Sequence, residues 1–274
     1  FRLPVKILLP YMLRSFGGTL RPEASTFFDR SMTVVLPEAV SVTIWRYGFF
    51  EEDVCFYLMS LLRPGDTFID IGGHFGFFSM LGRELVGERG SVFTFEPMPS
   101  TREILLENMS RHGPAARCTV IPAAAGAFDG RITFQDFGLT GSAFATSATV
   151  RSSAVKQVGK VEVDVRTLDS VIKDLELTTC RLIKVDAENA EYDVIQGGIA
   201  SIRSLRPAII LEAGDSDEGD GATRRVLDVL LAERYLAYEF RDWSLSPHKV
   251  AERYGYQNLL MIPQEQVGNR VGPN

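Results

Sequence analysis

The sequence predicts an α/β fold, a doubly wound and mostly parallel sheet of seven strands with helices on both faces. From residue 66 onward, short runs rich in Val, Ile and Phe alternate with stretches of helical periodicity. The first five runs lack the polar alternation of a sheet with one solvated face, so we expect both faces to be covered. Strands that alternate with helices in this way form parallel sheets through right-handed crossovers.

Length, charge and cysteine content restrict the class of protein. The 274 residues are 45% hydrophobic and 23% charged, which suits one packed domain with an extension. The net charge of −6 argues against a nucleic acid as the main partner. No stretch reaches the ~18 apolar residues that indicate a transmembrane helix. The three cysteines lie far apart without C-x-x-C spacing, so we expect a cytoplasmic protein with reduced cysteines.

Residues 1–65 precede the first core strand and are predicted to form an N-terminal extension or cap. Their first 21 residues contain four basic side chains and no acid. We expect this segment to pack over one end of the sheet, with a substrate lid or a contact with a membrane surface as the alternatives. Residues 31–48 are predicted as strands or a hairpin, and residues 50–62 as a helix that Pro64 and Gly65 end.

The main domain is predicted over residues 66–263, followed by a tail over residues 264–274. Its seven strands are predicted at Thr67–Ile71, Ser91–Phe95, Cys118–Ile121, Leu182–Asp186, Ala208–Glu212, Leu236–Phe240 and Asn258–Ile262. Its helices are predicted at Phe78–Leu85, Ser100–His112, Ala190–Leu205 and Ala222–Glu233.

Two further segments alternate apolar and polar residues, Gly130–Phe137 and Lys160–Thr167. Each is predicted as a strand with one exposed side. Residues 130–167 therefore form a predicted β insertion after the third core strand, either a hairpin or a flap that faces the substrate.

The turn after the first core strand contains three glycines behind an aspartate. Glycines allow a sharp bend and a close approach of a ligand to the backbone. A dinucleotide motif would need glycines where His74 and Phe77 stand, and no Gly-Lys-Ser/Thr end of a P-loop follows. The carboxylate of Asp70 would repel pyrophosphate and favour a cation such as S-adenosylmethionine. The predicted cofactor-binding residues of this turn are Asp70, Gly72, Gly73, His74, Phe75 and Gly76.

The second core strand ends in an acid, Glu96, followed by Pro97 and Met98. An acid at this position is placed to accept hydrogen bonds from ribose hydroxyls. Nicotinamide enzymes share the feature, so it predicts a nucleoside ligand rather than one particular cofactor. We add these three residues to the predicted cofactor site.

Five stretches in order resemble the FkbM family of methyltransferases: "FIDIGGHFGFFS", "FEPMPSTREILLENM", "VRTLDSVI", "LIKVDAENAEYDVIQGG" and "RPAIILE". The resemblance implies a Rossmann-like class I fold that binds S-adenosylmethionine. His74 and Met98 stand where the family pattern has Asn, and Asn189 where it has Gly. His74 either donates to the cofactor as Asn would or changes the pH dependence of binding, while Asn tolerates the left-handed backbone of a glycine position.

Methyl transfer to a hydroxyl group needs an aligned acceptor and a base that takes the proton. Asp186 ends the fourth core strand, Glu188 lies two residues beyond it, and Glu212 ends the fifth, so these acids are the predicted catalytic residues. Repulsion between Asp186 and Glu212 would raise one pKa, and Asp186 is also a predicted cofactor ligand. We expect no metal.

The acceptor pocket is predicted from the segments that match the family least: the N-terminal segment, the β insertion and residues 241–257. Within the last segment, Trp243 and His248 are predicted to bind substrate.

The resemblance implies O-methylation of a small natural product, sugar or glycan-like acceptor in secondary metabolism. Methylation of nitrogen on a similar acceptor is an alternative. A nicotinamide-dependent oxidoreductase and a non-catalytic nucleoside-binding domain are alternatives from other classes. The expected partner is a small molecule, and the sequence is compatible with a homo-oligomer.

Overall fold

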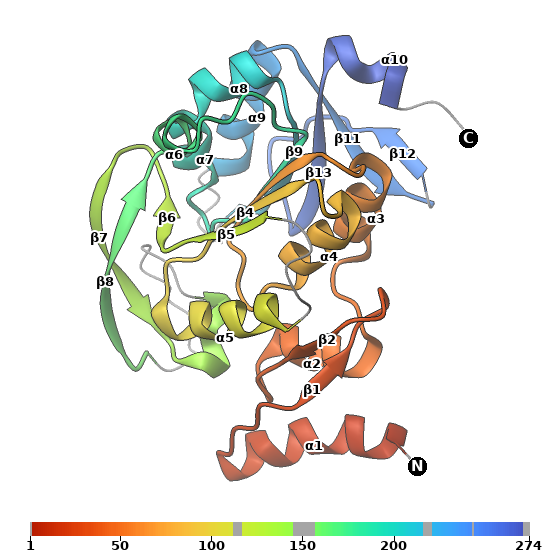
Figure 1. Cartoon of the computed structure of the whole chain (residues 1–274), viewed down its shortest axis with the longest axis vertical. Coiled ribbons are helices and arrows are strands. Elements are labelled where there is room, and N and C mark those ends of the chain that lie inside the picture. Colours follow the sequence, from red (N-terminus) through yellow and green to blue (C-terminus); the bar gives the residue numbers. More distant parts are fainter. Residues whose placement is uncertain (1, 112–116, 145–156, 216–220, 243, 271–274) are drawn as a thin grey trace.

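An eight-stranded sheet forms the centre of the molecule (Figure 1). The computed structural model describes residues 2–111, 117–144, 157–215, 221–242 and 244–270. The strand order is β12-β11-β13-β10-β9-β3-β4-β5. The bounds are β3 Thr67–Ile71, β4 Ser91–Phe95, β5 Arg117–Ile121, β9 Leu182–Val185, β10 Ala208–Ala213, β11 Tyr235–Arg241, β12 Ser244–Pro247 and β13 Gln257–Pro263.

The sheet is mostly parallel, as predicted. The strands β3, β4, β5, β9 and β10 pair in parallel, while β13 runs antiparallel to its neighbours β10 and β11. All seven predicted strands are present. The described sheet has one strand more than predicted, because residues Ser244–Pro247 fold back antiparallel on β11 to form β12 at the edge.

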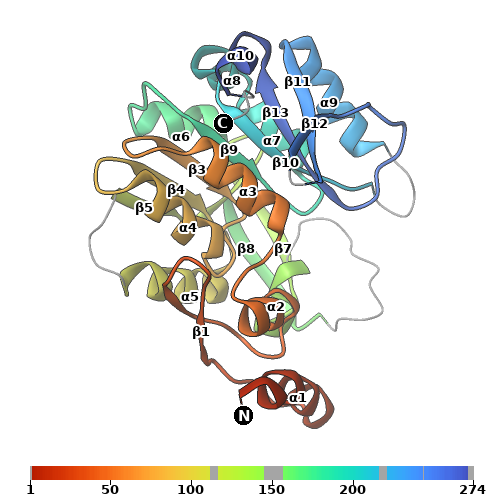
Figure 2. The ribbon, with the colours of Figure 1, turned by 90° about the vertical axis from the view of Figure 1, so that its right-hand side faces the viewer.

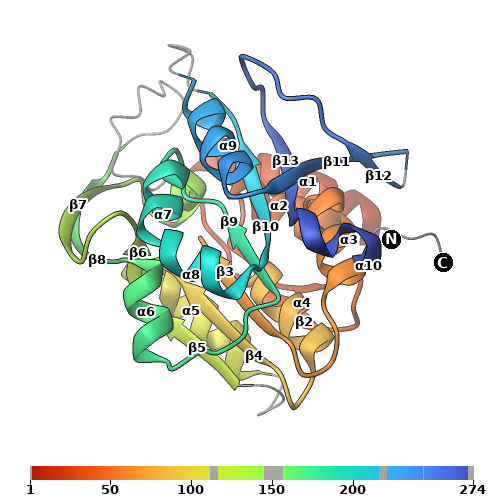
Figure 3. The same ribbon diagram turned by 90° about the horizontal axis from the view of Figure 1, so that it is seen from above.

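Helices cover both faces of the sheet (Figures 1 and 3). Successive residues of β3 point to opposite faces, so Phe68 joins one apolar core and Ile69 the other. Gly198 leaves helical geometry, so the single helix predicted over residues 190–205 is two helices. The first core includes α3 (Glu52–Leu61), α4 (Phe77–Val86) and α5 (Pro99–Ser110), and the second α6 (Leu168–Asp174), α7 (Glu191–Gly197), α8 (Ile199–Leu205) and α9 (Ala222–Ala232).

The two strands of the β insertion and the preceding β6, which the prediction did not include, form a separate three-stranded sheet with the order β6-β8-β7. Its strands are β6 Ala123–Ala125, β7 Gly130–Asp136 and β8 Gly159–Arg166. The two predicted alternating segments pair antiparallel as β7 and β8. A 3-10 helix, η1 (Leu139–Phe144), follows β7. The described chain ends in η2 (Gln264–Gln266) and α10 (Val267–Arg270).

The N-terminal extension contains α1 (Arg2–Phe16), β1 (Glu23–Ser25), β2 (Ser31–Thr33), α2 (Ala39–Tyr47) and α3. The prediction of strands over residues 31–48 is right only for β2. Residues 39–47 form α2 despite their β-branched side chains, because the Glu38 carboxylate caps the helix by accepting from Val40 N and Ser41 N.

The first helix, α1, lies against α2 at one end of the molecule, away from the main sheet (Figures 1 and 2). This arrangement differs from the expected cap over a sheet end. None of the described helices is long and apolar enough to cross a membrane.

Candidate functional site

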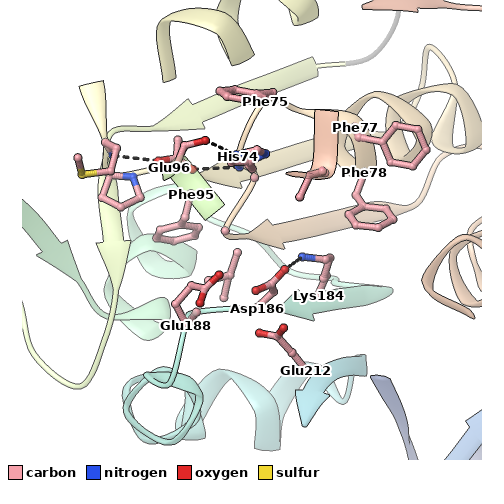
Figure 4. Close-up of a pocket in the computed structure, with 18 of the residues that line it drawn as sticks. His74, Phe75, Phe77, Phe78, Phe95, Glu96, Lys184, Asp186, Glu188 and Glu212 are labelled. Carbon is pink, nitrogen blue, oxygen red and sulfur yellow. Dashed lines mark hydrogen bonds and ion pairs between the residues drawn. The ribbon is translucent and has the colours of Figure 1, made fainter. Parts of the chain in front are cut away.

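A cavity of about 380 Å³ opens at the carboxyl ends of β3, β4, β9 and β10 (Figure 4). This is the end at which open α/β sheets bind ligands. The turns after β3, β4 and β9 supply its inner wall, and the N-terminal extension and the β insertion supply the outer wall. The volume lies in the range of small-molecule sites.

The glycine turn after β3 is shaped by its close packing. Gly72 has φ +79°, and a Cβ atom there would lie 2.0 Å from the carbonyl oxygen of Asp186. A Cβ atom on Gly73 would lie 2.1 Å from Thr94 Cγ2. Both glycines line the cavity, whereas Gly76 precedes α4 and is absent from the lining. The bare backbone is therefore required by the neighbouring strands as well as open to a ligand.

Asp70 does not stand at the mouth of the cavity, which corrects its predicted placement. Its side chain points into the protein from β3 and is fully buried, and it is absent from the cavity lining. Ser79 Oγ donates to Asp70 Oδ2 over 2.5 Å, and Lys184 Nζ lies 4.0 Å from Oδ1. Asp70 therefore supports the turn from beneath.

His74 connects the glycine turn to two other segments. It has φ +49°, a conformation that Asn at this position would also tolerate. Its backbone N–H donates to Glu96 Oε2 over 2.9 Å, and its ring Nε2 lies 2.7 Å from Ser142 Oγ in η1. The ring packs on Phe75, with 3.9 Å between centroids. Burial lowers the pKa of His74, so its ring is neutral near neutral pH.

Glu96 holds the turns after β3 and β4 together. Besides the bond from His74, its Oε1 accepts from Met98 N over 2.9 Å. The side chain is 6% exposed, and burial raises its pKa to about 7. Glu96, Pro97 and Met98 all line the cavity. A carboxylate has lone pairs beyond the two used here, so Glu96 can still accept ligand hydroxyls.

Asp186 follows β9 and Glu212 lies near the end of the adjacent β10, and the two acids lie together on one side of the cavity, opposite Glu96 and His74 (Figure 4). Burial and the charge of Asp186 raise the pKa of Glu212, which is therefore protonated and donates to Asp186. Burial alone would raise the pKa of Asp186, but Lys184 and the bond from Glu212 lower it below its usual value. The expected repulsion thus divides the pair into an anion and a neutral acid.

Two more acids line the cavity with pKa values near neutrality. Burial raises the pKa of Glu188 to about 8 and that of Glu51 to about 7. Glu51 precedes α3 in the N-terminal extension, and Tyr256 OH donates to its Oε1. No described donor meets ordinary hydrogen-bond distance and angle limits at its buried Oε2. Sequence reasoning missed Glu51, because an acid before a helix ordinarily indicates only a helix start.

The outer wall of the cavity is mainly apolar. It combines Met32, Val40, Ile44 and Phe50 of the N-terminal extension with Ile132, Phe134 and Ser142 of the β insertion and Tyr256 before β13. All three segments from which an acceptor pocket was predicted therefore contribute to this wall.

Of the two predicted substrate residues, the structure describes only His248, and His248 does not line the cavity. Trp243 lies outside the described residues. His248 is absent from the lining, and its ring nitrogens lie 2.7 Å from Glu239 Oε2 and 3.0 Å from Tyr254 OH. In the described part of the chain, no cluster of three or more His, Cys, Asp or Glu side chains could hold a metal ion.

Carboxyl groups dominate the polar lining. Five acids line the cavity together with a single lysine, Lys184: Glu51, Glu96, Asp186, Glu188 and Glu212. An excess of acids in a partly closed cavity favours a cationic ligand. Repulsion between the acids also raises the pKa of some of them, which therefore stay neutral.

Comparison with known proteins identifies relatives. Residues 70–256 match the family described as Methyltransferase FkbM domain. The 2-O-methyltransferase NoeI of Sinorhizobium fredii is 30% identical over 186 residues, which cover 63% of this chain and 74% of that protein. The hexuronic acid methyltransferase AglP of Haloferax volcanii is 26% identical over 171 residues, 61% of this chain and 65% of that protein.

Among solved structures, the FkbM methyltransferase of Methylobacillus flagellatus is similar with a TM-score of 0.45 and 16% identity. The superposition covers 76% of this chain and 50% of that one. The chain thus spans just under two thirds of AglP and half of the M. flagellatus protein.

Proposed function

The chain belongs to the FkbM family of S-adenosylmethionine-dependent methyltransferases, and we propose that it methylates a hydroxyl group on a sugar, glycan-like or other small natural-product acceptor. Family membership over residues 70–256 supports a methyltransferase over the nicotinamide-dependent oxidoreductase and the non-catalytic domain.

The residues of the inner wall fit the cofactor. S-adenosylmethionine supplies an electrophilic methyl group when bound, and it is a cation without phosphate. The carboxylates of Glu96 and Asp186, and the backbone of Gly72 and Gly73 that lines the cavity, would hold it. Glu96 would accept from the ribose hydroxyls, and the excess of acids favours the positive charge.

One observation carries the proposal of a hydroxyl acceptor: among the described residues, no donor meets ordinary hydrogen-bond limits at the buried Oε2 of Glu51, and the pKa of this acid is about 7. An alcohol must lose its proton during attack, and a base is most effective when its pKa lies near the working pH. Glu212 is protonated and Asp186 is paired with Lys184, so both are poorly suited to this role. We assign Glu51 as the general base, with Glu188 as the second candidate.

The relatives support a sugar-like acceptor. One is named a 2-O-methyltransferase and another a hexuronic acid methyltransferase. A sugar ring could pack its apolar face on the apolar wall and bind the acids through its hydroxyl groups. Neutral carboxyl groups donate to hydroxyls, and ionised ones accept from them.

Calorimetry and product analysis test the proposal. The chain should bind S-adenosylmethionine and S-adenosylhomocysteine but not NAD. It should then be incubated with S-adenosylmethionine and three acceptor sets: neutral glycosides, hexuronic acid glycosides and amino sugars. Formation of S-adenosylhomocysteine with an O-methyl signal by NMR is expected for one of the first two sets. Exclusive N-methylation of the amino sugars would overturn the proposed hydroxyl chemistry.

A further inference from the structure

The outer face of α1 is apolar and exposed. Six of the sixteen exposed large apolar side chains among the described residues belong to this fifteen-residue helix. Their exposed fractions run from 44% for Ile7 to 83% for Phe16. Such a concentration marks an interaction surface rather than the usual scatter of single apolar side chains. The six residues are Val5, Ile7, Leu8, Tyr11, Met12 and Phe16.

The opposite face of α1 is held by α2. Arg46 donates to the carbonyl oxygens of Lys6 over 3.4 Å and of Ile7 over 3.2 Å. Lys6 Nζ lies 5.4 Å from the centre of the Trp45 ring, and Pro10 is buried. These contacts fix one side of the helix, which lies at one end of the molecule (Figures 1 and 2), and the six apolar side chains stay exposed.

Charge distinguishes this end from the rest of the chain. Residues 1–22 carry four basic side chains and no acid, although the whole chain has a net charge of −6. An anionic surface would attract this segment and repel the remaining, acidic part. The attraction acts over roughly 10 Å at 0.1 M salt, which orients the chain with α1 toward the surface. Two copies of α1 would bring like charges together, which disfavours self-association through this face.

We propose that α1 binds the surface of an anionic lipid bilayer. Its apolar side chains enter the interface, and the positive charge of residues 1–22 attracts the segment to the lipid phosphates. At fifteen residues the helix is shorter than the ~20 residues of a membrane span, so it lies in the plane of the interface. Because α2 carries Val40 and Ile44 of the cavity wall, binding through α1 holds the cavity one helix away from the lipid.

Vesicle co-sedimentation of the 274-residue chain tests the proposal. We expect binding to vesicles of phosphatidylcholine with phosphatidylglycerol, and weak binding to phosphatidylcholine alone. Raising the salt from about 0.1 M to about 1 M should release the chain, because the screening length falls about threefold. Equal binding to both vesicle types, or no binding to either, overturns the proposal.

A double variant and a matched control locate the contact. Leu8→Ser with Met12→Ser should reduce the bound fraction about tenfold. Met59→Ser with Phe128→Ser changes two side chains of similar exposure outside α1 and should bind as the wild type does. Loss of binding in both, or in neither, contradicts a contact through α1.

Two further measurements keep the outcomes separate. Calorimetric binding of S-adenosylhomocysteine verifies that each variant is folded. Vesicle co-sedimentation does not depend on the acceptor, so it tests the lipid contact independently of the proposed methylation. Analytical ultracentrifugation without lipid should give the same mass for the wild type and the α1 variant. A wild-type dimer that the α1 variant abolishes, without vesicle binding, would assign this face to a second copy instead.

Discussion

The ammonium nitrogen of Lys184 lies 2.7 Å from Oδ2 of Asp186, inside the sheet and almost without exposure. The same nitrogen lies 4.0 Å from Oδ1 of the fully buried Asp70. Burial alone would lower the pKa of Lys184, but the neighbouring acids raise it above its usual value, so the lysine stays charged. Lys184 is therefore the counter-charge for the acids beneath and beside the cavity.

Replacing Lys184 with Met should destabilise the fold by about 3–5 kcal/mol, because it leaves Asp70 and Asp186 buried without their cation. Urea unfolding measures the change. Lys173→Met, at an exposed position on α6, should stay within about 0.5 kcal/mol of the wild type. Similar small effects at both positions would contradict the role given to Lys184.

Gly72→Ala should destabilise the chain more than Gly65→Ala. Both glycines have positive φ, +79° and +97°, so both variants pay for a left-handed residue, about 1–2 kcal/mol. Only at Gly72 would the new Cβ atom lie 2.0 Å from a backbone oxygen, that of Asp186; at Gly65 no atom lies within 4 Å. We expect a difference of about 2 kcal/mol or more in urea unfolding. Equal losses would show that backbone strain alone requires glycine at position 72.

Glu212→Gln should leave turnover within about threefold of the wild type. The carboxyl group of Glu212 is protonated and donates to Asp186, and the amide of Gln can donate in its place. Glu212→Ala removes the donor and should reduce kcat/KM about tenfold. Steady-state kinetics at saturating S-adenosylmethionine distinguishes the two variants. A loss of turnover of about a hundredfold in the Gln variant would instead support the base role predicted from the sequence.

Glu96→Ala should weaken cofactor binding by about 1–3 kcal/mol if its carboxylate accepts from the ribose. Because Glu96 also accepts from His74 N and Met98 N, loss of affinity alone would not separate the two roles. Calorimetry with S-adenosylhomocysteine and its 2′-deoxy analogue separates them. The wild type should prefer the parent compound, and Glu96→Ala should lose that preference. If Glu96→Ala still prefers S-adenosylhomocysteine over its 2′-deoxy analogue, Glu96 only links the turns after β3 and β4. Glu103→Ala, at an exposed position, serves as the control.

Local patterns predicted the main sheet well. The core strands are continuous apolar runs bounded by turn residues, and such runs have few other ways to be buried. Residues 39–47 were predicted wrongly because their β-branched run favours a strand, whereas the cap from Glu38 and the burial of Ile44 produce a helix. Asn189 has φ +75°, the left-handed backbone that its tolerance of a glycine position predicted.

The site was predictable in part, because strand ends can be recognised in sequence but side-chain directions cannot. The acids at the ends of β4, β9 and β10 do line the cavity. Asp70 fits the same pattern, yet its place on β3 turns it inward, a distinction that spacing alone does not contain. Glu51 precedes Asp186 by more than a hundred residues, and only the folding of the N-terminal extension over the sheet brings it to the cavity.

The assignment of Glu51 as the base predicts a particular pH dependence. Burial raises its pKa to about 7, so the free enzyme holds a proton on Glu51 at low pH and loses it as the pH rises. The value of kcat/KM should therefore increase between about pH 6 and pH 8 and then level off.

Glu51→Gln should lower turnover about a hundredfold or more and remove this increase, while calorimetric affinity for S-adenosylhomocysteine stays unchanged. Glu52→Gln, at the exposed neighbouring position, should keep the wild-type profile. If Glu51→Gln keeps the increase in kcat/KM and Glu188→Gln loses it, Glu188 is the base instead. Because the pKa of Glu188 is about 8, the midpoint of the increase would then lie about one pH unit higher.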